Sequence, residues 1–124
     1  MGASASGAAA FYREVAEKGE VWAIKDAEGF PTATNASGET AMPFWSSRSR
    51  TQLVIRRVEA YSGFEPVQLS LEAFLQNWLP GLQDDGLFVG VNWSGERARG
   101  YDAQPQDVAK SIAHHLRARK QAPG

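Results

Sequence analysis

Cysteine is absent from this sequence of 124 residues. Its absence excludes disulfides, cysteine-ligated zinc, iron–sulfur clusters and a thiol nucleophile. Small secreted domains are commonly stapled by disulfides, so we expect a cytoplasmic protein. No apolar run approaches the roughly 18 residues that a membrane-spanning helix needs, and the N-terminal residues lack the basic and apolar regions of a signal peptide. We therefore expect no membrane association.

An excess of charge of either sign is also missing. The 13 Lys and Arg residues nearly balance the 14 Asp and Glu residues, which leaves a net charge of -1. Proteins that bind duplexes usually carry a basic excess, because contacts to the phosphate backbone dominate their affinity. We therefore expect no nucleic-acid partner. The hydrophobic fraction of 43% fits a globular domain and argues against disorder.

Motifs for catalysis or metal binding are equally scarce. The two histidines, His114 and His115, are neighbours on a predicted helix, where adjacent side chains point about 100° apart and do not easily share one metal ion. Asp84 and Asp85 precede a glycine in an ordinary turn and lack the spacing of a calcium loop. There is no nucleophile elbow and no phosphate-binding loop. We expect no cofactor and no metal site, and the sequence argues against an enzyme without excluding one.

Hydrophobic periodicity and turn residues predict a single α+β domain over residues 8–119, with frayed termini at 1–7 and 120–124. The expected order is α-β-β-α-β-α-β-β-α, a mixed sheet of four or five strands packed with helices. The expected helices cover residues 8–18, Ser46 or Ser47 to 58, Ser70 to 79 and 105 onward, and the expected strands cover 20–25, 30–34, 66–69, 87–91 and 97–101. The first two strands are expected to form a hairpin. Residues 35–40 are expected to form a loop, 92–95 a turn, and Pro80-Gly81 a helix end.

The segment Pro43-Phe44-Trp45-Ser46-Ser47-Arg48-Ser49-Arg50 is the most informative part of the chain. It places an indole, three hydroxyls and two guanidinium groups at a predicted helix N-terminus, where free backbone N–H groups favour anions. The candidate residues for binding a ligand or a partner are Trp45, Ser46, Ser47, Arg48, Arg50 and Trp93. A purely structural role fits the same residues, as a helix cap, core tryptophans and solvated arginines.

The predicted helix that follows carries four arginines in all, because Arg56 and Arg57 lie near its end. Its apolar face is expected to comprise Leu53, Val54 and Val58, with Ile55 alongside. The arginines would then form either a basic interface or a solvated surface.

The four tryptophans, Trp22, Trp45, Trp78 and Trp93, lie in different predicted elements. Indole rings contribute large apolar surfaces, but each N–H group needs a hydrogen-bond partner when it is buried. We expect most of them in the core, with a groove lined by two of them as the alternative.

Several motifs recur in a fixed order in one family of small bacterial proteins. They are Val21-Trp22-Ala23-Ile24, Pro43-Phe44-Trp45-Ser46, Leu75-x-x-Trp78-Leu79-Pro80-Gly81-Leu82, and Asp85-Gly86 followed by Val89-Gly90-Val91-Asn92-Trp93. On these motifs the chain resembles the DUF2750 family over about residues 11–115. The resemblance implies a bacterial source and a stand-alone cytosolic protein, and it implies no activity.

Two functional hypotheses remain from the sequence. The first is a non-enzymatic protein-binding module, such as an adaptor or an immunity-type inhibitor, with a protein partner or a second copy of the chain bound through aromatic and arginine residues. The second is a site for a small anionic ligand, with or without turnover, at the N-terminus of the helix that starts near Ser46.

Overall fold

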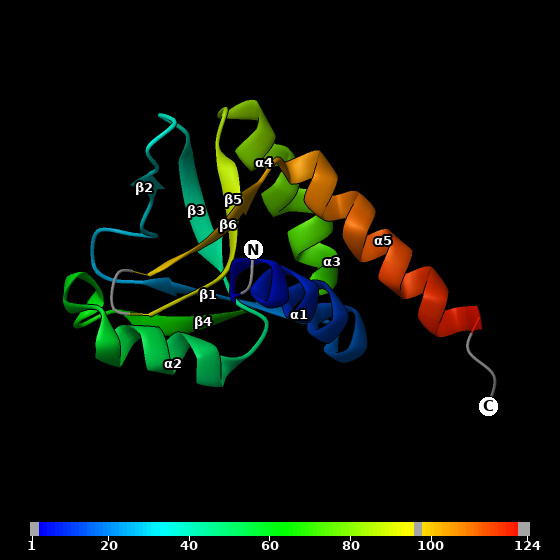
Figure 1. Cartoon of the computed structure of the whole chain (residues 1–124), viewed down its shortest axis with the longest axis horizontal. Helices are drawn as coiled ribbons and strands as arrows, with labels where there is room; N and C mark the ends of the chain where they lie inside the picture. The colour runs from blue at the N-terminus through cyan, green and yellow to red at the C-terminus, as the bar shows by residue number, and fades with distance from the viewer. Residues whose placement is uncertain (1–2, 96–97, 122–124) are drawn as a thin grey trace.

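The computed structural model describes residues 3–95 and 98–121 and has an α+β fold (Figure 1). The α+β class is confirmed, and the order of elements broadly matches the prediction, with one additional strand. The elements are α1 (Ala3–Lys18), β1 (Glu20–Lys25), β2 (Ala33–Thr34), β3 (Thr40–Phe44), α2 (Arg48–Arg57), η1 (Glu59–Tyr61), β4 (Glu65–Ser70), α3 (Leu71–Ala73), the π-helix η2 (Phe74–Trp78), α4 (Leu79–Asp84), β5 (Phe88–Ser94), β6 (Arg99–Ala103) and α5 (Pro105–Gln121). No helix within the described ranges has the length and apolar character needed to cross a membrane.

The strands form a two-stranded sheet and a four-stranded sheet. β1 and β4 pair antiparallel, and the larger sheet has the order β2-β3-β5-β6, in which only the β3–β5 pair is parallel. One bridge joins the two sheets: the N–H of Trp22 donates to the carbonyl of Trp45 at 2.8 Å, and the N–H of Trp45 donates back at 2.7 Å. This link holds β1 beside the end of β3, where α2 begins.

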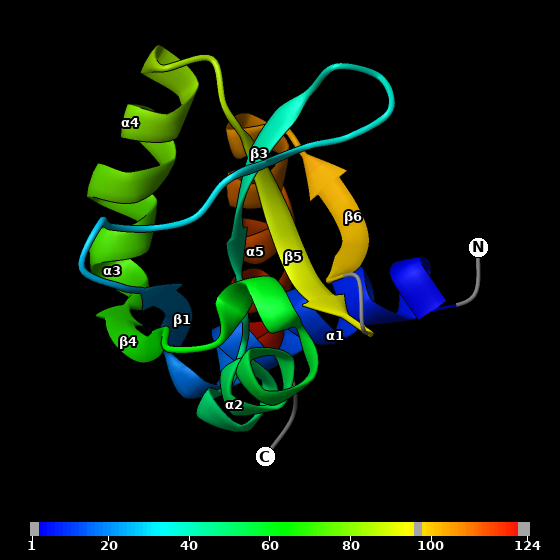
Figure 2. The same cartoon turned by 90° about the vertical axis from the view of Figure 1, so that its left-hand side faces the viewer.

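Two hydrophobic cores lie on opposite sides of the strands. Along β1, Val21 and Ala23 belong to the first core, whereas Trp22 and Ile24 belong to the second, as the alternation of a strand requires. Helices α1, α4 and α5 contact β5 on the side of the first core, and α2 packs against β1, β4 and β5 over the second core (Figures 1 and 2). The end of β5 therefore lies between helices on both of its faces.

The predicted hairpin between residues 20–25 and 30–34 is wrong. β1 pairs with β4 over six residue pairs, and β2 is only two residues long and pairs instead with β3, which the sequence did not reveal as a strand. β1 is buried along four consecutive residues, so its backbone groups lose their hydrogen bonds to water. The long, non-local partner β4 replaces more of these hydrogen bonds than the short neighbouring segment can. Pro31 also lacks the N–H group that a continuous hairpin ladder needs.

The helix that was expected to end at Pro80-Gly81 continues to Asp84. Proline has no N–H group, and its ring would clash with the carbonyl four residues earlier in a regular helix. The chain widens into a π-helix just before this proline, and the N–H of Leu79 bonds to the carbonyl of Phe74, five residues back. The wider turn accommodates Pro80 without breaking the helix.

Candidate functional site

The candidate site is organised by a bulge in β5 that directs Trp93 to the second core. The prediction of a turn at residues 92–95 is wrong, because β5 continues to Ser94. The pairing of β5 with β6 shifts register between Val91 and Ser94, and Asn92 adopts a positive φ of 51°. Simple alternation would place Trp93 on the same face as Val91, in the first core. The bulge instead places it in the second core with Trp45.

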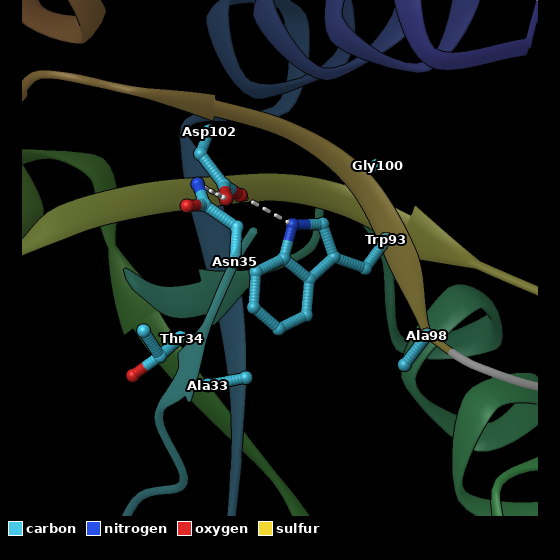
Figure 3. A pocket seen from close by; sticks show the side chains of 7 residues that line it. All are labelled: Ala33, Thr34, Asn35, Trp93, Ala98, Gly100 and Asp102. Carbon is cyan, nitrogen blue, oxygen red and sulfur yellow. Dashed lines mark hydrogen bonds between the residues drawn. The ribbon is translucent and has the colours of Figure 1, made fainter. Parts of the chain in front are cut away.

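Two glycines and one carboxylate hold the Trp93 indole in place. A Cβ on Gly90 would overlap the indole ring, and a Cβ on Gly100 would lie 2.8 Å from its Cδ1 atom. The indole N–H donates to Oδ1 of Asp102 at 2.9 Å (Figure 3). The carbonyl of Trp93 accepts the indole N–H of Trp45 at 2.8 Å. The orientation of Trp93 is therefore fixed by hydrogen bonds at both its indole N–H and its carbonyl oxygen. Its side chain is almost fully buried.

A crevice of about 50 Å³ opens between α2 and the end of β5. Trp45 and Trp93 line it together with four residues of α2: the buried Val54, and Arg50, Leu53 and Arg57, which lie at positions i, i+3 and i+7. We call Arg50, Leu53 and Arg57 the crevice face of α2. Leu53 is 37% exposed, which is unusual here for a large apolar side chain among the described residues. The crevice thus combines indole surface, one exposed leucine and two guanidinium groups.

A polar network lies beside the crevice and joins α1, α2 and β5. Glu14 accepts two hydrogen bonds from the Arg50 guanidinium, at 3.2 Å from Nε and 2.9 Å from Nη2, and one from the Ser46 hydroxyl at 2.5 Å. The side-chain oxygen of Asn92 accepts the backbone N–H of Ser46 at 3.0 Å, and its amide donates to the carbonyl of Gly7 at 3.2 Å. This network fixes the start of α2 against α1 and the bulge.

The carboxylate of Glu14 is stabilised in its charged form. The hydrogen bonds from Arg50 lower the pKa of Glu14 most, partial burial opposes them, and the Ser46 hydroxyl and the positive charges of Arg50 and Arg13 lower it further. Arg50 is therefore already paired with an internal anion at neutral pH.

The other arginines of α2 have no such partner. Within the described residues, Arg48, Arg56 and Arg57 form no ion pair, and all three are exposed. α2 contains four arginines and no acidic residue. The helix is thus a concentrated positive surface on a chain whose net charge is -1.

Comparison with known proteins gives one decisive match. The family model described as "Protein of unknown function (DUF2750)" matches residues 8–112. The chain belongs to the DUF2750 family. The resemblance drawn from the sequence motifs is thereby confirmed. None of the curated proteins compared with the chain matches it.

The match covers the whole candidate site of this DUF2750 protein. It extends from Ala8 in α1 to Ile112 in α5, and so includes Glu14, the start of α2 and the bulge at Asn92. The family model therefore covers every side chain of the crevice face and of the polar network described above.

The structure brings three of the six predicted site residues of this DUF2750 protein into one crevice: Trp45, Arg50 and Trp93. The other three lie close by with different surroundings. Ser46 is fully buried in the polar network. Ser47 is the N-cap of α2, and its hydroxyl accepts the N–H of Arg50 at 3.3 Å. Arg48 is exposed, and its guanidinium lies 6.0 Å from the centre of the Trp22 ring.

Sequence reasoning missed Glu14 and Asn92, and it placed Leu53 on the buried face of α2. Thr51 lies on the buried face of α2, where Leu53 was expected. Thr51 is fully buried, and its hydroxyl donates to the carbonyl of Arg48 at 2.5 Å. Asn92 did leave a signal, because asparagine tolerates positive φ and commonly marks a backbone irregularity. Glu14 left none, since its partners lie 32 and 36 residues away.

The tryptophans of this DUF2750 protein are mainly core residues, as the sequence favoured. Trp45 is fully buried, Trp22 and Trp93 are nearly so, and Trp78 is partly buried against the first core. Trp45 and Trp93 nevertheless also line the crevice, so their roles in the core and at the site coincide.

The groups that line the crevice include two indole rings, one leucine and two guanidinium groups. The one hydroxyl beside a carboxylate, that of Ser46, is fully buried and donates its hydrogen bond to Glu14. Among the residues that the structure describes, no three His, Asp or Glu side chains lie together as a metal centre would require.

Proposed function

We propose that this DUF2750 protein is a non-enzymatic binding module that recognises an acidic segment of another protein through the crevice face of α2. The single observation that carries the proposal is the arrangement of Arg50, Leu53 and Arg57 around a crevice floored by Trp45 and Trp93. Arginine and tryptophan are enriched among the residues that dominate binding energies at protein interfaces. An acidic side chain of the partner would pair with the guanidinium group of Arg57, which forms no ion pair among the described residues, while an apolar neighbour contacts Leu53.

The distribution of charge supports a protein partner. The net charge is +4 on α2 and therefore -5 on the rest of the chain, since the whole chain has -1. A nucleic acid would approach α2 but would be repelled by the remainder, because its phosphates extend well beyond one helix. A short acidic segment contacts the positive surface alone.

The same charges disfavour a two-fold dimer through α2. An isologous interface places the same patch on both subunits, so the arginines of one copy would face those of the other. Like charges that meet across an interface are costly, which makes a second copy of the chain a weaker candidate than a different, acidic protein. The adaptor and immunity-type roles considered from the sequence both require such a surface.

The alternative of a small anionic ligand at the N-terminus of α2 has less support. The cap hydroxyl of Ser47 and the N–H of Ser46 already have internal partners. Glu14 occupies the position beside Arg50 where the anion was expected. An external anion would have to displace this carboxylate, whereas Arg57 at the other end of the crevice has no internal ion pair among the described residues.

A random peptide library displayed on phage and selected on the immobilised protein tests the proposal. We expect enrichment of peptides that combine acidic residues with a leucine or a similar apolar residue. Binding of an enriched peptide is then measured by fluorescence polarisation for the parent protein, Arg57→Glu and Leu53→Ser. Arg56→Glu is the matched control, because it makes the same charge change at the next residue, outside the crevice.

We expect Arg57→Glu and Leu53→Ser to weaken binding by about tenfold or more, as hot-spot substitutions do, and Arg56→Glu to weaken it clearly less. Equal losses for Arg57→Glu and Arg56→Glu would show non-specific charge attraction and reject the crevice. Selection of peptides without acidic residues, or equally tight binding of a short DNA duplex, would reject an acidic protein partner.

A further inference from the structure

A second pocket, of about 180 Å³, is lined by residues of the two outer strands of the larger sheet, β2 and β6, and by Trp93 of β5. Among the residues that the structure describes, it shares only Trp93 with the crevice and includes no residue of α2. Figure 3 shows the Asp102 carboxylate, the Asn35 amide and the indole nitrogen of Trp93 gathered on one side, with Ala33, Thr34 and Ala98 around the remaining space. We propose that this pocket binds the ammonium or guanidinium group of a small organic cation. This inference is independent of the proposed function.

The carboxylate of Asp102 is held in a fixed orientation. Its Oδ1 atom accepts the Trp93 indole N–H at 2.9 Å, and its Oδ2 atom accepts the Asn35 amide at 3.2 Å. Both donors are neutral, so the carboxylate keeps its negative charge, and each oxygen has a further lone pair for another donor. A group that is already ordered loses little conformational entropy when it binds a ligand.

Asn35 is itself immobilised by its own loop. Its side-chain oxygen accepts the backbone N–H groups of Ser37 at 2.9 Å and Glu39 at 3.0 Å. Its amide also donates to the Glu39 carboxylate at 3.0 Å. This loop therefore brings a second carboxylate to the side chain that supports Asp102, which makes the polar side of the pocket negative. In the described part of the chain neither carboxylate forms an ion pair.

The remaining walls select the size and polarity of the ligand. Ala33, Ala98 and Gly100 have side chains that are small and apolar, or absent, so they leave room but offer no hydrogen bonds. A water molecule occupies about 30 Å³ in the liquid, so the pocket has room for about six non-hydrogen atoms. A compact cation with a short apolar part fits this space, and a fixed carboxylate forms strong charge-assisted hydrogen bonds with ammonium and guanidinium groups.

The test is a titration of the ¹⁵N-labelled protein with methylguanidinium and n-butylammonium, followed by NMR. The Trp93 indole N–H donates directly to Asp102, so its resonance reports on binding at that carboxylate. Trp93→Phe assigns this resonance by removing it. The neutral molecules N-methylurea and n-butanol have similar shapes and serve as ligand controls.

Three variants complete the design. Asp102→Asn removes the charge but keeps an oxygen that can accept the indole N–H. Ala33→Leu fills the pocket from an exposed strand position, which keeps the test valid if the first variant folds poorly. Asp84→Asn is the matched control, since it removes the same charge from an exposed position at the end of α4.

We expect saturable binding of at least one of the two cations and of neither neutral molecule. Asp102→Asn and Ala33→Leu should each weaken this binding by about tenfold or more, the loss expected for a hydrogen bond to a charged group. Asp84→Asn and Arg57→Glu should bind like the parent protein, which separates this site from the crevice. No saturable shift with either cation, or unchanged binding by both Asp102→Asn and Ala33→Leu, would overturn the proposal.

Discussion

The indole ring of Trp93 occupies the space in which a side chain on Gly90 would lie. The two residues belong to the same strand and are three positions apart, so regular alternation would send them to opposite faces. Because of the bulge at Asn92, Trp93 lies on the same face as Gly90, and its indole ring lies across the strand. Both the crevice and the pocket beside Asp102 depend on this placement, because Trp93 lines each of them.

Gly90→Ala should therefore destabilise the protein. The added methyl group has no free volume, and overpacking of this kind typically costs about 1–3 kcal/mol. Gly81→Ala is the control, because a Cβ at that helical position meets no atom within 4 Å. It should leave the free energy of unfolding unchanged or raise it by about 0.5–1 kcal/mol. Urea unfolding measures both, and a Gly90→Ala protein as stable as the parent would contradict the placement of the ring.

Asn92 combines an unusual backbone conformation with buried hydrogen bonds, and two substitutions separate these contributions. Asn92→Gly keeps the positive φ but leaves the buried N–H of Ser46 without its acceptor, which should cost about 1–3 kcal/mol. Asn92→Ala also strains the backbone and should cost about 1–2 kcal/mol more. The difference in urea midpoint between the two variants checks this order. Equal stabilities would mean that the bulge imposes no strain.

The ion pair between Glu14 and Arg50 makes stability depend on acid pH. The pKa of Glu14 is lowered from its ordinary value of 4.5 in the folded protein. A lowered pKa means that the contribution is complete above the pKa of the unfolded chain and is lost as the pH falls through the folded pKa. Glu14→Gln should thus be less stable than the parent at pH 7, and the gap should shrink below about pH 4.5. Thermal melts across pH 7 to 3 measure it.

Glu17→Gln provides the control for that pH series, because Glu17 lies on the same helix and is exposed. It should change stability little at any pH in the range. A parallel loss of stability in the parent and in Glu14→Gln on acidification would show that Glu14 does not contribute to acid sensitivity.

Trp45 and Trp78 should differ in their contributions to stability. Trp45 is fully buried and donates to the carbonyl of Trp93, so Trp45→Ala should cost about 3–5 kcal/mol. Trp78 is partly buried and packs edge-on against Phe30 and Phe44, with ring centres 5.0 and 5.8 Å apart. Trp78→Ala should therefore cost less than Trp45→Ala. Guanidinium unfolding of the two variants measures which one loses more free energy of unfolding. A larger loss for Trp78→Ala would show that the first core contributes more to stability than the second.

Local features of the fold were predictable because they depend on neighbours in the chain. The sequence predicted helix caps at Ser70 and at either Ser46 or Ser47. Ser70 and Ser47 are the caps, each accepting an N–H from three residues later. The strand predicted at residues 87–91 is present as β5, which lies between β3 and β6. The sequence motifs were also sufficient to suggest the DUF2750 family, since the family model matches nearly the same residues.

The pairing of strands was not predictable in the same way. In the chain, β2, β3, α2 and η1 separate β1 from β4. The two strands pair because a partner that matches all six residues of β1 satisfies more backbone groups than the adjacent segment can. Residues 20–34 alone contain no information about β4, so the hairpin predicted from them is wrong.

At the site, the sequence by itself determined which chemical groups are available: the indoles of Trp45 and Trp93, the arginines that follow Ser47, and the capping serine. Only the tertiary structure decided what those groups do. It buried Ser46, paired Arg50 with Glu14 from α1, and used the bulge at Asn92 to bring Trp93 beside Asp102. The physical reason is that caps and helices follow from contacts three or four residues apart. The Glu14–Arg50 pair spans 36 residues, so it exists only after the whole chain has packed.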